Sequence, residues 1–125
     1  MIFTADQLVA HAIGDYVLQS HWMASEKTKR WLPAAAHALT YMIPFIVIGA
    51  SPLGLAIIGG THFVIDRWRL AKYLVWAKNH IAPASPGPLT ATGYPEDAPV
   101  WLTTWLLIAA DNALHVCINA WAMTL

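Results

Sequence analysis

The stretch WLPAAAHALTYMIPFIVIGASPLGLAIIGGTHFVI (residues 31–65) decides the fold, because it contains no Asp, Glu, Lys or Arg. A membrane-spanning helix needs about 20 mostly apolar residues, so the stretch is long enough for one span and most of a second. Pro33 suits the first turn of a helix, and Ala50-Ser51-Pro52 is typical of a short turn. We therefore predict one helix over 33–49 and another over 53–77.

Two further apolar segments flank this stretch, at about 2–23 and 99–123, with a Pro-rich irregular loop over 79–98 between the third and fourth spans. The chain is 58% hydrophobic and only 11% charged, with a mean hydropathy of +0.49. Soluble domains are roughly 25% charged, so the composition favours the membrane class. The prediction is an all-α integral membrane four-helix bundle, formed by a single transmembrane domain over 1–125.

Charge and cysteine content exclude other classes. Seven Lys and Arg residues balance seven Asp and Glu residues, which removes the electrostatic basis for nucleic-acid binding. A single Cys excludes an internal disulfide framework.

The cations predict the topology. They lie after the first span and at the end of the third, which is one side of a four-span protein: Lys27, Lys29, Arg30, Arg67, Arg69, Lys72 and Lys78. By the positive-inside rule this side is cytoplasmic, and both termini are then on the non-cytoplasmic side. The expected location is the bacterial inner (cytoplasmic) membrane, with several passes.

Each predicted span carries polar residues four positions apart, and this spacing places them on one helix face. The first span has Gln7, His11, Asp15 and Gln19, the second His37 and Tyr41, the third His62 and Asp66, and the fourth Asp111 and His115. A charged group that faces lipid at the helix centre costs at least about 2.5 kcal/mol, so these faces should point inward.

His and Asp side chains on facing helices are what a divalent metal needs, with Zn favoured and Mn, Fe, Ni or Mg as alternatives. The candidate ligands are His11, Asp15, His37, His62, Asp66, Asp111 and His115. A carboxylate that binds no metal, Asp15 or Asp66, is the candidate catalytic base. The alternative is that these side chains form hydrogen bonds between helices, and that Asp66 pairs with Arg67 or Arg69.

The motifs His11-Ala-Ile-Gly-Asp15-Tyr-Val-Leu-Gln19, His37-Ala-Leu-Thr-Tyr41, His62-Phe-Val-Ile-Asp66 and Asp111-Asn112-Ala-Leu-His115 cover most of the chain. In this order they resemble a family of short bacterial and phage-encoded membrane proteins of unknown function. That family shows H-x-x-G-D-x-x-x-Q, H-A-x-x-Y, H-x-x-x-D and a late D-Q-x-x-H, so Asn112 departs from it. The resemblance implies site residues rather than an activity. A looser similarity to membrane-bound metal-dependent hydrolases is an analogy only.

Three functions follow as hypotheses. The first is a metal-dependent hydrolase that acts at the cytoplasmic leaflet, where the cations could hold an anionic headgroup or a phosphorylated substrate. The second is a non-catalytic protein with a structural metal or polar core, which binds a partner or alters the envelope. The third is transport of a proton or metal ion. The expected partners are membrane lipids, with a homo-oligomer or a second membrane protein as further possibilities.

Overall fold

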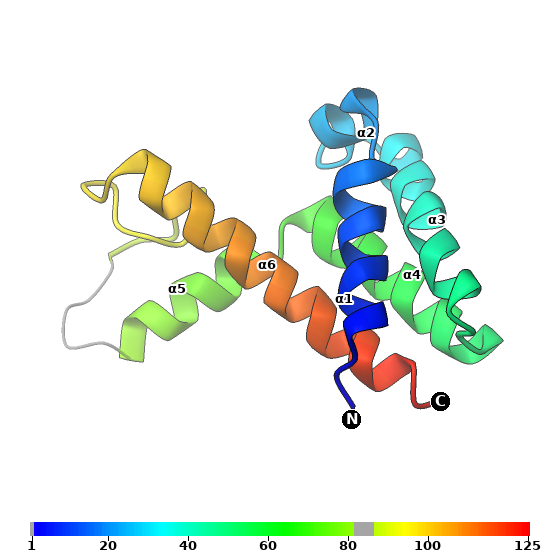
Figure 1. Cartoon of the computed structure of the whole chain (residues 1–125). Helices are drawn as coiled ribbons and strands as arrows, with labels where there is room; N and C mark the ends of the chain where they lie inside the picture. Colours follow the sequence, from blue (N-terminus) through cyan, green and yellow to red (C-terminus); the bar gives the residue numbers. More distant parts are fainter. Residues whose placement is uncertain (1, 82–86) are drawn as a thin grey trace. The chain divides into compact units, whose positions relative to one another are not determined.

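The computed structural model describes residues 2–81 and 87–125, and all regular structure in these residues is helical. Figure 1 shows the elements in chain order, which are α1 (Ala5–Ala12), the π-helix η1 (Ile13–Val17), α2 (His21–Glu26), α3 (Trp31–Val47), α4 (Pro52–Trp68), α5 (Ala71–Ile81) and α6 (Val100–Ala122). The all-α prediction is confirmed. Among the described residues, only α6 is both long and apolar enough to cross a membrane by length and composition, while α3 is apolar but shorter.

The chain divides into two compact units. The first comprises Met1–Arg69 with His115–Leu125, and the second comprises Leu70–Leu114. The first unit therefore contains α1 to α4 and the last two turns of α6. The second contains α5 and the first part of α6.

In the first unit, α3 packs against α4, α2, η1 and α1. Its buried apolar side chains include Tyr41, Phe45 and Ile58, which come from α3 and α4. The end of α6 lies close to the start of α4, since a Cβ atom added at Gly54 would be 2.7 Å from the Ala122 carbonyl oxygen. Glycine at this position permits the close approach of the two backbones.

Side-chain caps fix where several helices begin. Thr4 and Gln7 form a capping box at the start of α1, because each side chain bonds to the backbone of the other residue. The Ser51 hydroxyl accepts a hydrogen bond from the Gly54 backbone N–H, and Pro52 takes the first position of α4. The predicted turn at 50–52 thus coincides with the start of α4.

Two predicted helices are interrupted in the structure. The helix predicted over 53–77 ends at Trp68 because Arg69 adopts a left-handed conformation with φ of 51°, and α5 begins afresh at Ala71. The segment predicted as one helix over 2–23 breaks after η1. There the Ser20 side chain accepts from the Met23 N–H and starts α2 in a new direction.

The Pro-rich segment predicted over 79–98 is irregular from residue 87 onward, its residues 79–81 belong to α5, and residues 82–86 lie outside the described part. Within the second unit it folds against α5. The Trp76 indole donates to the Gly87 carbonyl at 3.2 Å, and the Asn79 amide donates to the Gly93 carbonyl at 3.0 Å.

Candidate metal centre

The interior of the first unit contains a cluster of polar side chains beside its apolar core. Eight polar side chains from α1, η1, α3, α4 and α6 are between 0% and 7% exposed: Gln7, His11, Asp15, His37, His62, Asp66, His115 and Asn119. Buried ionisable groups are costly unless they pair or coordinate a metal. Their convergence therefore marks the candidate site of this protein.

The π-helix η1 carries Asp15 into this interior. The Leu18 N–H donates to the Ile13 carbonyl at 2.9 Å, which is the wider backbone turn of a π-helix. Such turns occur frequently at functional sites. The Gln19 side chain donates to the Asp15 carbonyl at 2.7 Å and stabilises the end of the element.

At the centre of the site two imidazoles meet between two carboxylates. The Nε2 atoms of His37 and His62 are 2.9 Å apart. Asp15 Oδ1 lies 3.3 Å from the first and 3.4 Å from the second. Asp66 Oδ2 lies 3.2 Å from each. Each of the two carboxylates thus lies within 3.4 Å of both imidazoles.

The spacing of these atoms fits a metal ion. Ligands about 2.0–2.1 Å from a tetrahedral zinc ion lie about 3.3 Å apart. The triad Asp15, His37 and His62 has separations of 2.9, 3.3 and 3.4 Å, close to that value. A second triad consists of His62, Asp66 and His115. Because His62 belongs to both triads, the cluster has donors for a metal beside either carboxylate.

Asp15 Oδ1 is buried and has no hydrogen-bond donor among the described residues. A buried carboxylate oxygen without a donor is destabilising, and a cation at this position would compensate it. The His–Asp contacts also become ion pairs when the imidazoles are protonated. The same arrangement can therefore hold a metal ion or a proton.

The outer oxygens of the two carboxylates face further groups. Asp66 Oδ1 lies 3.2 Å from His115 Nε2, and Asp15 Oδ2 lies 3.5 Å from His11 Nδ1. The Lys27 ammonium donates to Asp66 Oδ2 at 2.6 Å. The cluster thus extends from α1 to α6, with a cation at one edge.

Tyr41 holds the histidines in place. Its ring stacks on His62, with a centroid distance of 3.6 Å and an interplanar angle of 13°. Its hydroxyl oxygen accepts from the Asn119 amide at 2.6 Å and lies 2.7 Å from His11 Nδ1. The hydroxyl thereby joins α1, α3 and α6 behind the carboxylates.

The structure brings together six of the seven predicted ligands: His11, Asp15, His37, His62, Asp66 and His115. Asp111 lies in the second compact unit, and its predicted role stays a prediction. The expected pairing of Asp66 with Arg67 or Arg69 is not seen. Its cationic partner is Lys27, and Arg67 donates instead to the Thr28 carbonyl at 2.6 Å.

The sequence placed Tyr41 on an inward-facing helix face and Lys27 among the cations that could hold an anion, but it did not predict that Lys27, Tyr41 or Asn119 contacts the candidate ligands. Tyr41 and Asn119 each follow a predicted ligand by four residues, so they share a helix face with His37 and His115. That spacing was a usable signal. Nothing in the sequence indicated that Lys27 contacts Asp66, since a lysine in a loop after a span is explained by topology alone.

One protein family matches the sequence over residues 2–85, and it is described as "Protein of unknown function (DUF3307)". No curated protein and no solved structure matches the chain. The matched range includes five of the six converging ligands, and His115 lies beyond it. The match agrees with the expected family of unknown function, whereas the motifs and the membrane character of that family stay predictions.

Proposed function

Because the chain belongs to the DUF3307 family, whose function is unknown, we propose its function from the site. We propose an integral membrane protein that binds a divalent metal, by ligand type most suitably Zn, between the imidazoles of His37 and His62 and the flanking carboxylates of Asp15 and Asp66. The observation that carries the proposal is the convergence of two imidazoles and two carboxylates in the interior of a bundle. Helical bundles build metal sites in this way.

The distribution of side chains supports a membrane location. The first unit buries its polar groups and exposes large aliphatic side chains on α1, η1, α3 and α4: Leu8, Val9, Val17, Leu39, Ile43, Ile46, Val47, Leu53 and Val64. In water this arrangement would be unfavourable, because large exposed apolar patches are rare on soluble monomers. In a bilayer it is the expected one, since ionisable groups there face the bundle interior.

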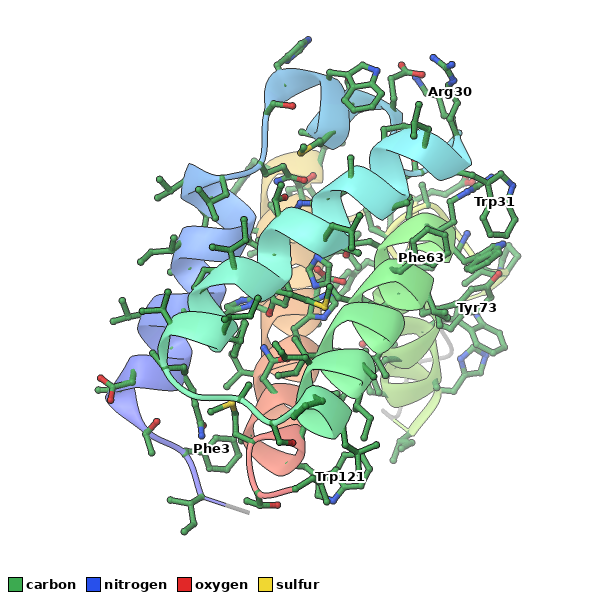
Figure 2. The ribbon with its side chains drawn as sticks, turned by 90° about the vertical axis from the view of Figure 1, so that its right-hand side faces the viewer. Phe3, Arg30, Trp31, Phe63, Tyr73 and Trp121 are labelled. Carbon is green, nitrogen blue, oxygen red and sulfur yellow. The ribbon has the colours of Figure 1, made fainter. Side chains whose placement is uncertain are left out.

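Aromatic residues mark both ends of the first unit. In Figure 2, Arg30 and Trp31 lie at one end, and Phe3 and Trp121 lie at the other. The Arg67 guanidinium lies 5.5 Å from the Trp31 ring centroid. Aromatic rings settle at both membrane interfaces, and Lys and Arg favour the cytoplasmic side. These ends support a cytoplasmic position for the loop between α2 and α3.

Hydrolysis is the activity we propose for this centre. A bound metal of this kind polarises a carbonyl or phosphoryl oxygen and activates water. The two carboxylates flank the same histidine pair, so one can serve as a ligand while the other accepts a proton from water. The substrate would be an ester that reaches the cluster from the cytoplasmic leaflet.

The experiment that tests the proposal measures bound metal. The protein is purified in mild detergent without a His tag and analysed by mass spectrometry, beside a His62→Ala/Asp66→Ala double variant. His21→Ala is the matched control, because His21 is exposed on α2. We expect about one or two equivalents of a transition metal in the wild type and control, and a loss in the double variant.

Absence of metal from the wild type, or equal metal in the double variant, would overturn the proposal. Metal binding without hydrolysis of phosphate or carboxylic esters would instead assign the protein to the non-catalytic alternative, in which the metal is structural.

A continuous chain of polar contacts favours proton transport as a second candidate. It runs from Asn119 through Tyr41 and His11 to Asp15, with separations of 2.6, 2.7 and 3.5 Å. From Asp15 it continues through His37 to Asp66. Chains of Asp and His within a membrane are typical of proton relays. Acidification of proteoliposomes, measured with a pH-sensitive dye and lost in Asp15→Asn, would support this candidate.

A further inference from the structure

Lys27 is a cation built into the edge of the cluster. Its ammonium is 2.6 Å from Asp66 Oδ2, and the two side chains are 19% and 5% exposed. Its backbone N–H donates to the Met23 carbonyl at 2.9 Å, which places Lys27 at the end of α2. The side chain therefore reaches inward from a fixed backbone position.

Arg67 fixes that backbone to the helix that carries Asp66. Its guanidinium donates to the Thr28 carbonyl at 2.6 Å and to the Lys29 carbonyl at 3.2 Å. Arg67 follows Asp66 directly in α4. One helix thus supplies the carboxylate that Lys27 contacts and also holds the loop from which Lys27 projects.

The neighbouring cation Lys29 is exposed and has a different ion-pair partner. It pairs with Glu26 at 3.2 Å, and its side chain is 66% exposed. In the part of the chain that the structure describes, Lys27 is the one Lys or Arg that forms an ion pair with Asp15 or Asp66. Lys29 therefore provides a matched control for Lys27.

The formal charges determine what a metal would do here. Without metal, Asp15 and Asp66 carry two negative charges, Lys27 carries one positive charge, and neutral imidazoles carry none. One negative charge is in excess. A divalent metal reverses this to one positive charge in excess. Buried charges in a low-dielectric interior need compensation, so the loaded cluster favours an anion, either hydroxide from bound water or the anionic group of a substrate, or the release of Lys27.

We propose that the metal-loaded cluster binds a phosphoryl group between the metal and the Lys27 ammonium. This inference rests on the proposed function and narrows its substrates to phosphate-bearing compounds, either a lipid headgroup or a free phosphate. Asp66 Oδ2 faces both imidazoles and also accepts from Lys27, so a metal between His37, His62 and that oxygen would compete with the ammonium and free it for a phosphoryl oxygen. The anion then restores the balance of charge.

The test measures zinc affinity by competition with a chromophoric chelator, for protein in detergent. Each protein is measured alone, with inorganic phosphate, with phosphatidic acid and with diacylglycerol. The variants are Lys27→Gln, Lys27→Arg and the control Lys29→Gln. Phosphate and metal that bind together should strengthen each other reciprocally, by about fivefold or more.

We expect phosphate or phosphatidic acid to tighten zinc binding in the wild type, Lys27→Arg and Lys29→Gln, and diacylglycerol to have no effect. Lys27→Gln should bind zinc more tightly than the wild type without phosphate, because the competing cation is gone, and should show no response to phosphate. A response to phosphatidic acid alone would identify a lipid headgroup, and a response to both anions would identify the phosphoryl group as sufficient.

Three results would overturn the inference. In the first, phosphate tightens zinc binding in Lys27→Gln as much as in the wild type. In the second, the wild type binds zinc but neither anion changes its zinc affinity, and in the third, diacylglycerol changes that affinity as much as the anions do. These results leave the proposed metal site intact. A wild type that binds no zinc or other transition metal would overturn the inference and the proposed function together.

Discussion

The Tyr41 hydroxyl connects α3, which carries it, to residues of α1 and α6 in the polar cluster. It accepts from the Asn119 amide and lies beside His11, while the ring below it stacks on His62. In metal sites, groups that hydrogen-bond to the ligands in this way orient them and tune their affinity for the metal.

Tyr41→Phe should therefore weaken metal binding while leaving the fold intact. Removal of the hydroxyl deprives the buried Asn119 amide of an acceptor, which costs about 1–3 kcal/mol of unfolding free energy. Loss of an orienting group typically lowers metal affinity about 10-fold to 100-fold. Chelator competition and thermal unfolding in detergent measure both effects.

The control is Tyr73→Phe, at an exposed position of α5, which should change neither the metal affinity nor the unfolding free energy. An unchanged affinity in Tyr41→Phe would show that Tyr41 does not orient the ligands.

Metal binding should also depend on pH with a definite sign. Imidazole and carboxylate ligands bind metal only in their deprotonated forms, so protons compete with the metal. We expect the affinity to fall as the pH falls, and the metal to be released in acid. Equilibrium dialysis over a pH series measures this. An affinity that is constant between neutral and acidic pH would be inconsistent with His37 and His62 as ligands.

Gly14 allows η1 to pack closely against Tyr41 of α3. A Cβ atom added at Gly14 would lie 2.5 Å from Tyr41 Cδ2, so no larger residue fits without movement of the ring. The π-helix therefore places Asp15 in the cluster and brings its backbone against Tyr41 at the same turn.

Gly14→Ala should destabilise the protein and disturb the site. The added methyl group has to displace Tyr41 from its position over His62, and overpacking of this kind costs about 1–3 kcal/mol. Gly60→Ala is the matched control, because a Cβ atom there meets nothing within 4 Å and alanine is the better helix former. We expect a lower melting temperature and less bound metal in Gly14→Ala, with neither loss in Gly60→Ala. Equal behaviour of the two variants would contradict the close packing of η1 on α3.

The first unit buries a polar cluster beside its apolar core and exposes large apolar side chains, and its two ends carry different parts of the chain. Figure 1 shows both chain termini at one end of this unit and α2 at the other. Lys27, Lys29 and Arg30 follow α2 in the sequence. The topology in which these cations are cytoplasmic and both termini are outside the cytoplasm stays a prediction.

Cysteine labelling of intact cells tests that topology. In a Cys117→Ala background, Leu125→Cys should react with a membrane-impermeant maleimide from outside. Lys29→Cys should react only after the membrane is opened. Both positions are exposed, so burial would not explain a difference. Labelling of Lys29→Cys alone in intact cells would invert the topology, and labelling of both would exclude a membrane between them.

The sequence by itself determined the helical class and the helix faces on which the polar side chains lie. Both follow from periodicity, because residues four apart in a helix share a face whatever surrounds them. Six of the seven predicted ligands are buried in the first unit, whereas Asp111 lies in the second. The interruptions at Ser20 and Arg69 were not predicted, since a side-chain cap and a left-handed residue look like ordinary positions in an apolar run.

Only the tertiary structure decided which groups meet. His37 and His62 are 25 residues apart in sequence, and Lys27 and Asp66 are 39 apart, yet each pair is in contact. Helical periodicity gives the direction of a side chain around its own axis, but neither the separation of two helices nor their relative height. The separation and relative height of two helices depend on packing, such as the contact of Gly14 with Tyr41 and the hydrogen bond from Arg67 to the loop after α2. The contact of Lys27 with Asp66 could therefore be recognised only in the folded protein.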